Sequence, residues 1–139
     1  MSRPNDLYHA QMLNLAADRS RTGHLDGATH HGEARNPLCG DRLSIELLLE
    51  TPMIELIRFE VRGCAIARAS AALMCSLVEL QTDRIALELG HRFREELESP
   101  ESAPIDPRFD AFRALRQIRS RRRCATLAWE ALEQALEGG

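Results

Sequence analysis

The stretch "LSIELLLETPMIELIRFEVR", residues 43–62, decides the fold because it repeats one simple pattern on both sides of a short turn. Apolar side chains occupy every second position before and after Thr51-Pro52: Leu43, Ile45, Leu47 and Leu49 first, then Ile57, Phe59 and Val61. Two alternating runs across such a turn predict an antiparallel hairpin with one buried face and one solvent-facing side.

Helical patterns fill most of the remaining chain. We predict a first helix over 5–18 and further helices over 64–81, 83–98, 108–120 and 124–137. The polar stretch 19–35 is expected to be a loop with one short strand near 30–35. Because strands precede most helices, we predict the α+β class: a small antiparallel sheet, the hairpin plus a third strand, packed by about five helices. The 139 residues are expected to form a single domain, 1–139.

Composition narrows the possible environments and partners. The net charge is −3 and hydrophobic residues make up 44%, so we expect no nucleic acid or membrane partner. No apolar run approaches the length of a membrane span, and the N-terminus lacks the apolar region of a signal peptide. A cytoplasmic location is therefore expected, where cysteines remain reduced and more often bind metal, react or pack than form disulfides.

Cysteines and one aspartate flank the predicted hairpin. Cys39 and Asp41 precede its first strand, and Cys64 follows its second strand at the start of a helix. These two strand ends lie together in an antiparallel pair, so Cys39, Asp41 and Cys64 should gather at one end of the sheet. Cys75 comes eleven residues after Cys64, about three helical turns further on, and is predicted to be a small core residue.

Cys124 is predicted in the first turn of the last helix, directly after Arg121, Arg122 and Arg123. A helix start and neighbouring arginines lower the pKa of a thiol. Three thiolates and a carboxylate would suit a tetrahedral Zn²⁺ or iron site. Taken singly, a cysteine at a helix start is more often a packing residue than a ligand, and a run of arginines is more often a solvated face. Asp41 alone could cap a turn.

Three motifs together carry a family resemblance. In the order "NPLCGDRL" (36–43), "RGCAIARAS" (62–70) and "RRRCATLAWEAL" (121–132), they resemble the SufU, IscU and NifU N-terminal family of iron–sulfur cluster assembly proteins. The resemblance covers roughly residues 5–137 and implies a SufU/IscU-like fold. It also implies that Cys39, Asp41, Cys64 and Cys124 form one metal site, with Gly40 allowing a sharp turn between two of its ligands.

Two features resemble the SufU branch of that family. Arg123 stands where IscU-type scaffolds have a histidine, and Cys64 and Cys124 are 60 positions apart. The resemblance then implies tightly held zinc and a persulfide sulfur acceptor, Cys39, that works with a SufS-type cysteine desulfurase and serves downstream cluster-assembly proteins. Such a protein would be a zinc-dependent sulfurtransferase.

Other interpretations stay open. The same four residues could assemble a [2Fe–2S] cluster, as a scaffold does, or hold iron, or form a structural zinc site in an interaction module. No HExxH motif is present, so a zinc hydrolase is not predicted, and the adjacent His30 and His31 are expected to be solvent-exposed. Segment 108–123 carries seven arginines against one acidic residue, Asp110, and could dock an acidic partner or be an exposed surface.

Overall fold

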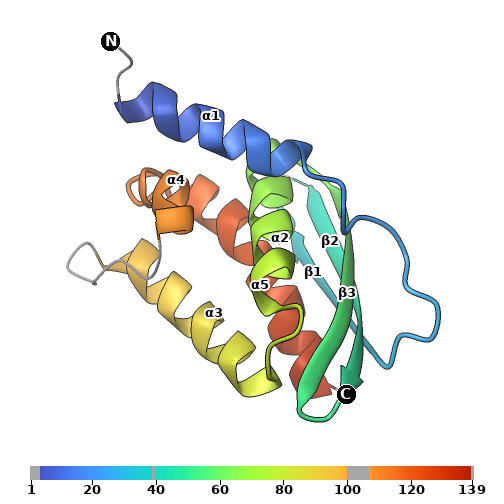
Figure 1. The fold of residues 1–139 in the computed structure, drawn as a ribbon. Coiled ribbons are helices and arrows are strands. Elements are labelled where there is room, and N and C mark those ends of the chain that lie inside the picture. The colour runs from blue at the N-terminus through green and yellow to red at the C-terminus, as the bar shows by residue number, and fades with distance from the viewer. Residues whose placement is uncertain (1–3, 39, 100–106, 139) are drawn as a thin grey trace.

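The computed structural model describes residues 4–38, 40–99 and 107–138. Strands β1 (His30–Asn36), β2 (Asp41–Glu50) and β3 (Met53–Arg62) form an antiparallel sheet in the order β1-β2-β3. The helices are α1 (Pro4–Ala17), α2 (Ala65–Val78), α3 (Asp83–Glu98), α4 (Asp110–Arg113) and α5 (Arg119–Gly138), and a 3-10 turn, Pro107–Phe109, precedes α4. Figure 1 shows the helices on one side of the sheet, which confirms the α+β class.

The hairpin faces the core as its alternation predicts. On β2, Leu43, Ile45 and Leu47 are buried, and each pairs with a core-facing partner on β3. These partners are Val61, Phe59 and Ile57, in that order. The third strand predicted near 30–35 is β1, which pairs along the other side of β2.

One irregularity near the hairpin turn changes which β3 residues face inward. Leu48 pairs with Leu56, but Leu49 pairs with Ile54, so Glu55 is an extra residue on β3. A bulge of this kind shifts the alternation by one position. Ile54 is therefore fully buried, which strict alternation from Ile57 did not predict.

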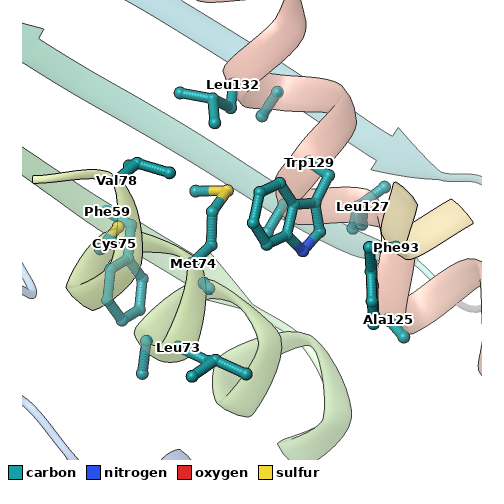
Figure 2. Close-up of a cluster of buried hydrophobic side chains, with 14 of the residues drawn as sticks. Phe59, Leu73, Met74, Cys75, Val78, Phe93, Ala125, Leu127, Trp129 and Leu132 are labelled. Carbon is teal, nitrogen blue, oxygen red and sulfur yellow. The ribbon is translucent and has the colours of Figure 1, made fainter. Parts of the chain in front are cut away.

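Two helices make the main contact with the sheet. Helix α2 packs on β3 and α5 packs on β1 and β2, while α1 covers α2 and α3 lies against α5. Because α2 lies between the sheet, α1 and α5, it is buried on most sides, as Figure 2 shows for Met74 and Cys75. The predicted helix 64–81 is three residues too long at its end: α2 stops at Val78, and Leu80 beyond it is exposed.

The predicted helices 108–120 and 124–137 are wrong in their boundaries. Only the short α4 forms in the first range, and α5 already begins at Arg119. Phe109 and Phe112 pack against α3, with ring centroids 5.0 and 5.7 Å from that of Phe93. These contacts hold α4 against α3, and α4 also packs against α1, so the chain turns before α5 starts.

A buried ion pair adds to this anchoring. Glu96 on α3 is only 1% exposed, and its Oε1 lies 2.8 Å from Nε of Arg113 on α4. The arginine-rich segment is therefore partly structural, because at least one of its guanidinium groups holds α4 to α3.

A helical membrane span requires a long apolar helix, and the described part of the chain contains none.

Helix α5 approaches the edge strand β1 unusually closely. A Cβ added at Gly32 would overlap the backbone oxygen of Ala131 and would lie 3.0 Å from Cβ of Ala135. One residue further, the Gln134 side-chain oxygen accepts a hydrogen bond from the Glu33 backbone N–H at 2.6 Å. Gly32 is thus the residue that lets α5 cover this strand.

We predict that Gly32→Ala lowers the free energy of unfolding by about 1–3 kcal/mol, because the added methyl forces α5 away from β1. The neighbouring His31→Ala, which changes an exposed side chain, should shift it by less than about 0.5 kcal/mol. Urea unfolding followed by circular dichroism measures both. Equal stability of Gly32→Ala and the unmodified protein would contradict the close packing.

Candidate metal centre

The two strand ends of the hairpin meet as the sequence predicted. Asp41 is the first residue of β2, and Cys64 is the N-cap of α2, two residues after β3 ends. Since Arg42 pairs with Arg62, the position of Asp41 falls beside Gly63 and Cys64. Cys124 reaches the same place from α5, so three elements supply one cluster.

The Asp41 carboxylate lies at the centre of this cluster. Its Oδ2 accepts hydrogen bonds from the Cys64 thiol at 3.4 Å and from the Cys124 thiol at 3.3 Å. Its Oδ1 accepts the Cys64 backbone N–H at 3.3 Å. The two thiol sulfurs and a carboxylate oxygen all lie within 4.8 Å of one another. Asp41 and Cys124 are buried, and Cys64 is partly buried.

Gly63 makes room for this carboxylate. A Cβ at Gly63 would overlap Oδ1 of Asp41 and lie 2.6 Å from its Cγ. Any larger residue would therefore push Asp41 out of the cluster. We did not identify Gly63 as a functional residue from the sequence, although a glycine between a strand end and a candidate ligand is a signal for close approach.

The turn from β1 into β2 is built by Asn36 and Gly40. The buried Asn36 accepts the Leu38 N–H on its side-chain oxygen at 3.2 Å and the Gly40 N–H on its carbonyl at 2.8 Å. Gly40 has a φ of +76°, a conformation that glycine adopts without strain. The predicted ligand Cys39 lies outside the described residues, between Leu38 and Gly40.

The prediction of an acidic thiol at Cys124 is wrong. Helix α5 begins at Arg119, so Cys124 lies beyond its first turn, and Arg123 pairs with Glu130 and donates to the Arg35 carbonyl. Burial raises the pKa of the Cys124 thiol above its ordinary value, and hydrogen bonds with Cys64 and Asp41 raise it further. The arginines before Cys124 therefore do not prepare it for ionisation.

The charges and ligand atoms of Asp41, Cys64 and Cys124 are suited to a bound cation. The cluster brings together a carboxylate and two thiols that each lose a proton on ligating a metal, and the three side chains carry no positive charge. A divalent ion bound among these groups would lower the pKa of the Cys124 thiol, because its positive charge favours the thiolate. Two thiols and a carboxylate within ligand reach suit Zn²⁺ or iron better than Mg²⁺ or Ca²⁺.

Cys75 takes no part in the cluster. It is fully buried on α2, where burial raises the pKa of its thiol, and Figure 2 shows it among apolar side chains such as Val78. The prediction that Cys75 is a core residue is confirmed. In the part of the chain that the structure describes, Asp41, Cys64 and Cys124 form the one group of His, Cys, Asp or Glu side chains close enough to share a metal ion.

The two adjacent histidines lie on β1. His31 is exposed as predicted, with its Nε2 3.6 Å from Oε2 of Glu46, while His30 is partly buried and its Nδ1 lies 2.8 Å from the Thr29 hydroxyl. Neither joins the cluster of Asp41, Cys64 and Cys124.

An open, mostly apolar cavity of about 590 Å³ adjoins the cluster. Cys64 and Cys124 form part of its lining, together with Tyr8 and Met12 of α1 and Ile118 just before α5. This cavity was not predictable from the sequence, because it depends on how α1 and α4 pack and no local motif encodes that packing. The cavity gives the two thiols a route to the surface.

Comparison with known proteins agrees with this arrangement. The sequence matches the NifU-like N terminal domain over residues 7–138. The zinc-dependent sulfurtransferase SufU of Bacillus subtilis is 32% identical over 112 residues, covering 77% of this chain and 76% of that protein. The iron–sulfur cluster assembly scaffold protein IscU of Streptococcus pyogenes is 32% identical over 142 residues, covering 99% and 87%.

Solved structures show the same fold. A crystal structure described as an iron–sulfur cluster assembly scaffold protein for the SUF system, from Fervidobacterium islandicum, superposes with a TM-score of 0.87 at 24% identity, covering 96% of this chain and 99% of that one. An N-terminal NifU-like protein from Brucella abortus gives 0.85 at 20%, covering 96% and 94%. With the domain match over most of its length, the chain belongs to the NifU-like N-terminal family of iron–sulfur cluster assembly proteins, the family that includes SufU and IscU.

Proposed function

We propose that this protein is a zinc-bound sulfur acceptor, a sulfurtransferase that receives persulfide sulfur from a SufS-type cysteine desulfurase and passes it to downstream cluster-assembly proteins. The observation that carries the proposal is the cluster of Asp41, Cys64 and Cys124, whose ligand atoms lie within 4.8 Å of one another. The name of the Bacillus subtilis relative, a zinc-dependent sulfurtransferase, supports it.

Cys39, Asp41, Cys64 and Cys124 would hold the zinc. Three thiolates and one carboxylate complete a tetrahedral set of the kind Zn²⁺ prefers. Zinc bound there supplies a positive charge that keeps the thiolates ionised near neutral pH. The proposal requires reduced thiols, which agrees with the cytoplasmic location expected from the sequence.

The reacting residue in this proposal is Cys39. Its thiolate attacks the terminal sulfur of the desulfurase persulfide, a new S–S bond forms at Cys39, and the S–S bond of the donor breaks. The desulfurase cysteine leaves as a thiolate, so charge is conserved and no external oxidant or reductant is consumed. The neighbours of Cys39 in the chain support access by a partner, because Leu38 is 91% exposed and Gly40 is also exposed.

The other three residues act as anchors. Cys64 caps α2 and Cys124 belongs to α5, so their positions are set by packed helices. Asp41 contacts both thiols and the Cys64 backbone N–H, which fixes its carboxylate independently of Cys39. When Cys39 reacts, the packing of α2 and α5 and the Cys64 backbone N–H would keep the other three residues in place.

A cluster scaffold is the second candidate, and the similarity to IscU of Streptococcus pyogenes over nearly the whole chain favours it. Such a protein would assemble a [2Fe–2S] cluster on the same Cys and Asp residues. Arg123 argues against this alternative. Its guanidinium is always protonated, cannot ligate iron, and is already engaged by Glu130 and the Arg35 carbonyl.

The first prediction for this proposal concerns metal content. Cys64→Ala and Cys124→Ala should lose most of their zinc and melt at lower temperature, because metal binding contributes directly to folding free energy. Gly63→Ala should also reduce zinc occupancy, since its methyl displaces the Asp41 carboxylate. Cys75→Ala is the matched control and should keep full occupancy in elemental analysis. Zinc loss from Cys75→Ala together with retention in Cys64→Ala would contradict the assignment.

The second prediction concerns the sulfur-carrying residue. After incubation with desulfurase and cysteine, mass spectrometry should find an adduct of about 32 Da, one sulfur atom, on Cys39. Cys39→Ser should take up no sulfur, whereas Asp41→Ala should change the transfer rate more than the fold. An adduct on Cys64 or Cys124 with unmodified Cys39 would refute Cys39 as the acceptor.

The third prediction separates zinc from iron. Protein purified aerobically and anaerobically should contain about one zinc per chain in both cases, and it should raise desulfurase turnover. The opposing result is a stable, coloured [2Fe–2S] form after anaerobic reconstitution, with no effect on the desulfurase. That outcome would favour the scaffold.

A further inference from the structure

Three arginines form a row across the outer face of the sheet, at the end that carries the candidate metal centre. Arg35 of β1 stands opposite Arg42 of β2, and Arg42 stands opposite Arg62 of β3. All three are exposed. Directly opposed residues in antiparallel strands have Cβ atoms about 4.5–5.5 Å apart, and like charges at such positions destabilise a sheet.

The charge of this arginine row is poorly balanced within the described residues. Glu33 lies beside it, with its Oε1 3.0 Å from Nε of Arg35 and 3.5 Å from Nε of Arg42. No ion pair joins Arg62 to any described carboxylate. One carboxylate therefore serves two of the three guanidinium groups.

Two further arginines stand beside the row. Arg19, just after α1, and Arg68 of α2 line an open groove of about 610 Å³ together with Arg42 and Arg62. The carboxylates in this groove already have partners: Glu33 contacts Arg35 and Arg42, and Glu60 lies 2.9 Å from Nε2 of His24. The groove thus carries a local excess of positive charge.

This excess is specific to one part of the sheet. The chain as a whole has a net charge of −3. The next row along the outer face is acidic, with Glu33, Ser44 and Glu60 in register, and the row after it is mixed, with His31, Glu46 and Arg58. Among these three described rows of the outer face, positive charge is concentrated in the one nearest Asp41 and Cys64.

We propose that the arginine row docks an acidic segment of a partner protein, the one that exchanges sulfur at the candidate metal centre. That the partner exchanges sulfur rests on the proposed function. Guanidinium groups form paired hydrogen bonds with carboxylates, and an acidic segment would remove the repulsion between opposed arginines. Arg42 directly follows Asp41, and Arg62 precedes Cys64 by two residues, so a docked segment lies beside the site.

The spread of the row favours a peptide over a small anion. Neighbouring strands are about 4.8 Å apart, so three arginines on three strands span about 10 Å. A single phosphate or carboxylate reaches one or two of them, whereas several carboxylates along an extended segment can engage all three. The groove continues the contact toward Arg19 and Arg68.

The unbalanced charge of the arginine row can be tested separately from docking. At low ionic strength, Arg62→Gln should raise the melting temperature, because it removes one of two opposed like charges. Arg84→Gln on α3, an exposed arginine outside the row, should leave it unchanged. A fall in melting temperature for Arg62→Gln would show that the row is already neutralised in the isolated protein, and the proposal would then be wrong.

The docking itself is tested on the zinc-loaded full chain by fluorescence anisotropy with a labelled peptide of six consecutive glutamates. The double variant Arg42→Gln/Arg62→Gln should bind this peptide at least about tenfold more weakly, and binding by the unmodified protein should weaken as salt is added. The control Arg84→Gln/Arg92→Gln makes the same charge change on α3 and should bind within about twofold of the unmodified protein. A matched peptide of six glutamines should not bind.

Three results would overturn the proposal: no binding of the glutamate peptide, equal losses in both double variants, or tighter binding of a twelve-nucleotide oligo-dT than of the peptide. The last would assign the row to nucleic acid. The proposed function is checked separately by loading Cys39 with sulfur from inorganic polysulfide. If the proposed function fails, that loading fails in the unmodified protein, whereas peptide binding by the arginine row persists.

Discussion

The arrangement of the candidate metal centre depends on the buried carboxylate of Asp41. It contacts the thiols of Cys64 and Cys124 and the backbone N–H that begins α2. Through these contacts one side chain joins the open end of the hairpin to both sheet-packing helices. The absence of a side chain at Gly63 is what allows the carboxylate to occupy this position. Asp41, Cys64 and Cys124 are side chains of the kinds that ligate metal ions, and this carboxylate brings their ligand atoms within 4.8 Å of one another.

The same strand ends produce two chemically opposite surfaces. Adjacent residues on a strand point to opposite faces of the sheet, so Asp41 turns inward while Arg42 turns outward. On β3 the exposed Arg62 is followed by Gly63, which lies against the Asp41 carboxylate. The candidate metal centre and the arginine row are therefore separated only by the thickness of the sheet. This arrangement would hold an acidic partner close to the thiols without placing its carboxylates among the metal ligands.

Short sequence patterns predicted the features that depend on residues close together in the chain. The alternation around Thr51-Pro52 gave the hairpin, the hairpin brought Asp41 beside Cys64, and helical spacing kept Cys75 away from both. Features that depend on packing between distant segments were not predictable. The start of α5 at Arg119 follows from how α4 packs against α3, and the raised pKa of Cys124 follows from its burial. The arginine row required the strand register, because its members are far apart in sequence.

The central claim is that Cys39, Asp41, Cys64 and Cys124 hold one metal ion. X-ray absorption at the zinc edge measures the ligand set most directly. The account predicts three sulfur ligands at about 2.3 Å and one oxygen at about 2.0–2.2 Å, with one sulfur lost in Cys39→Ser and none lost in Cys75→Ala. A first shell made only of nitrogen and oxygen, or a sulfur count unchanged in Cys39→Ser, would contradict it.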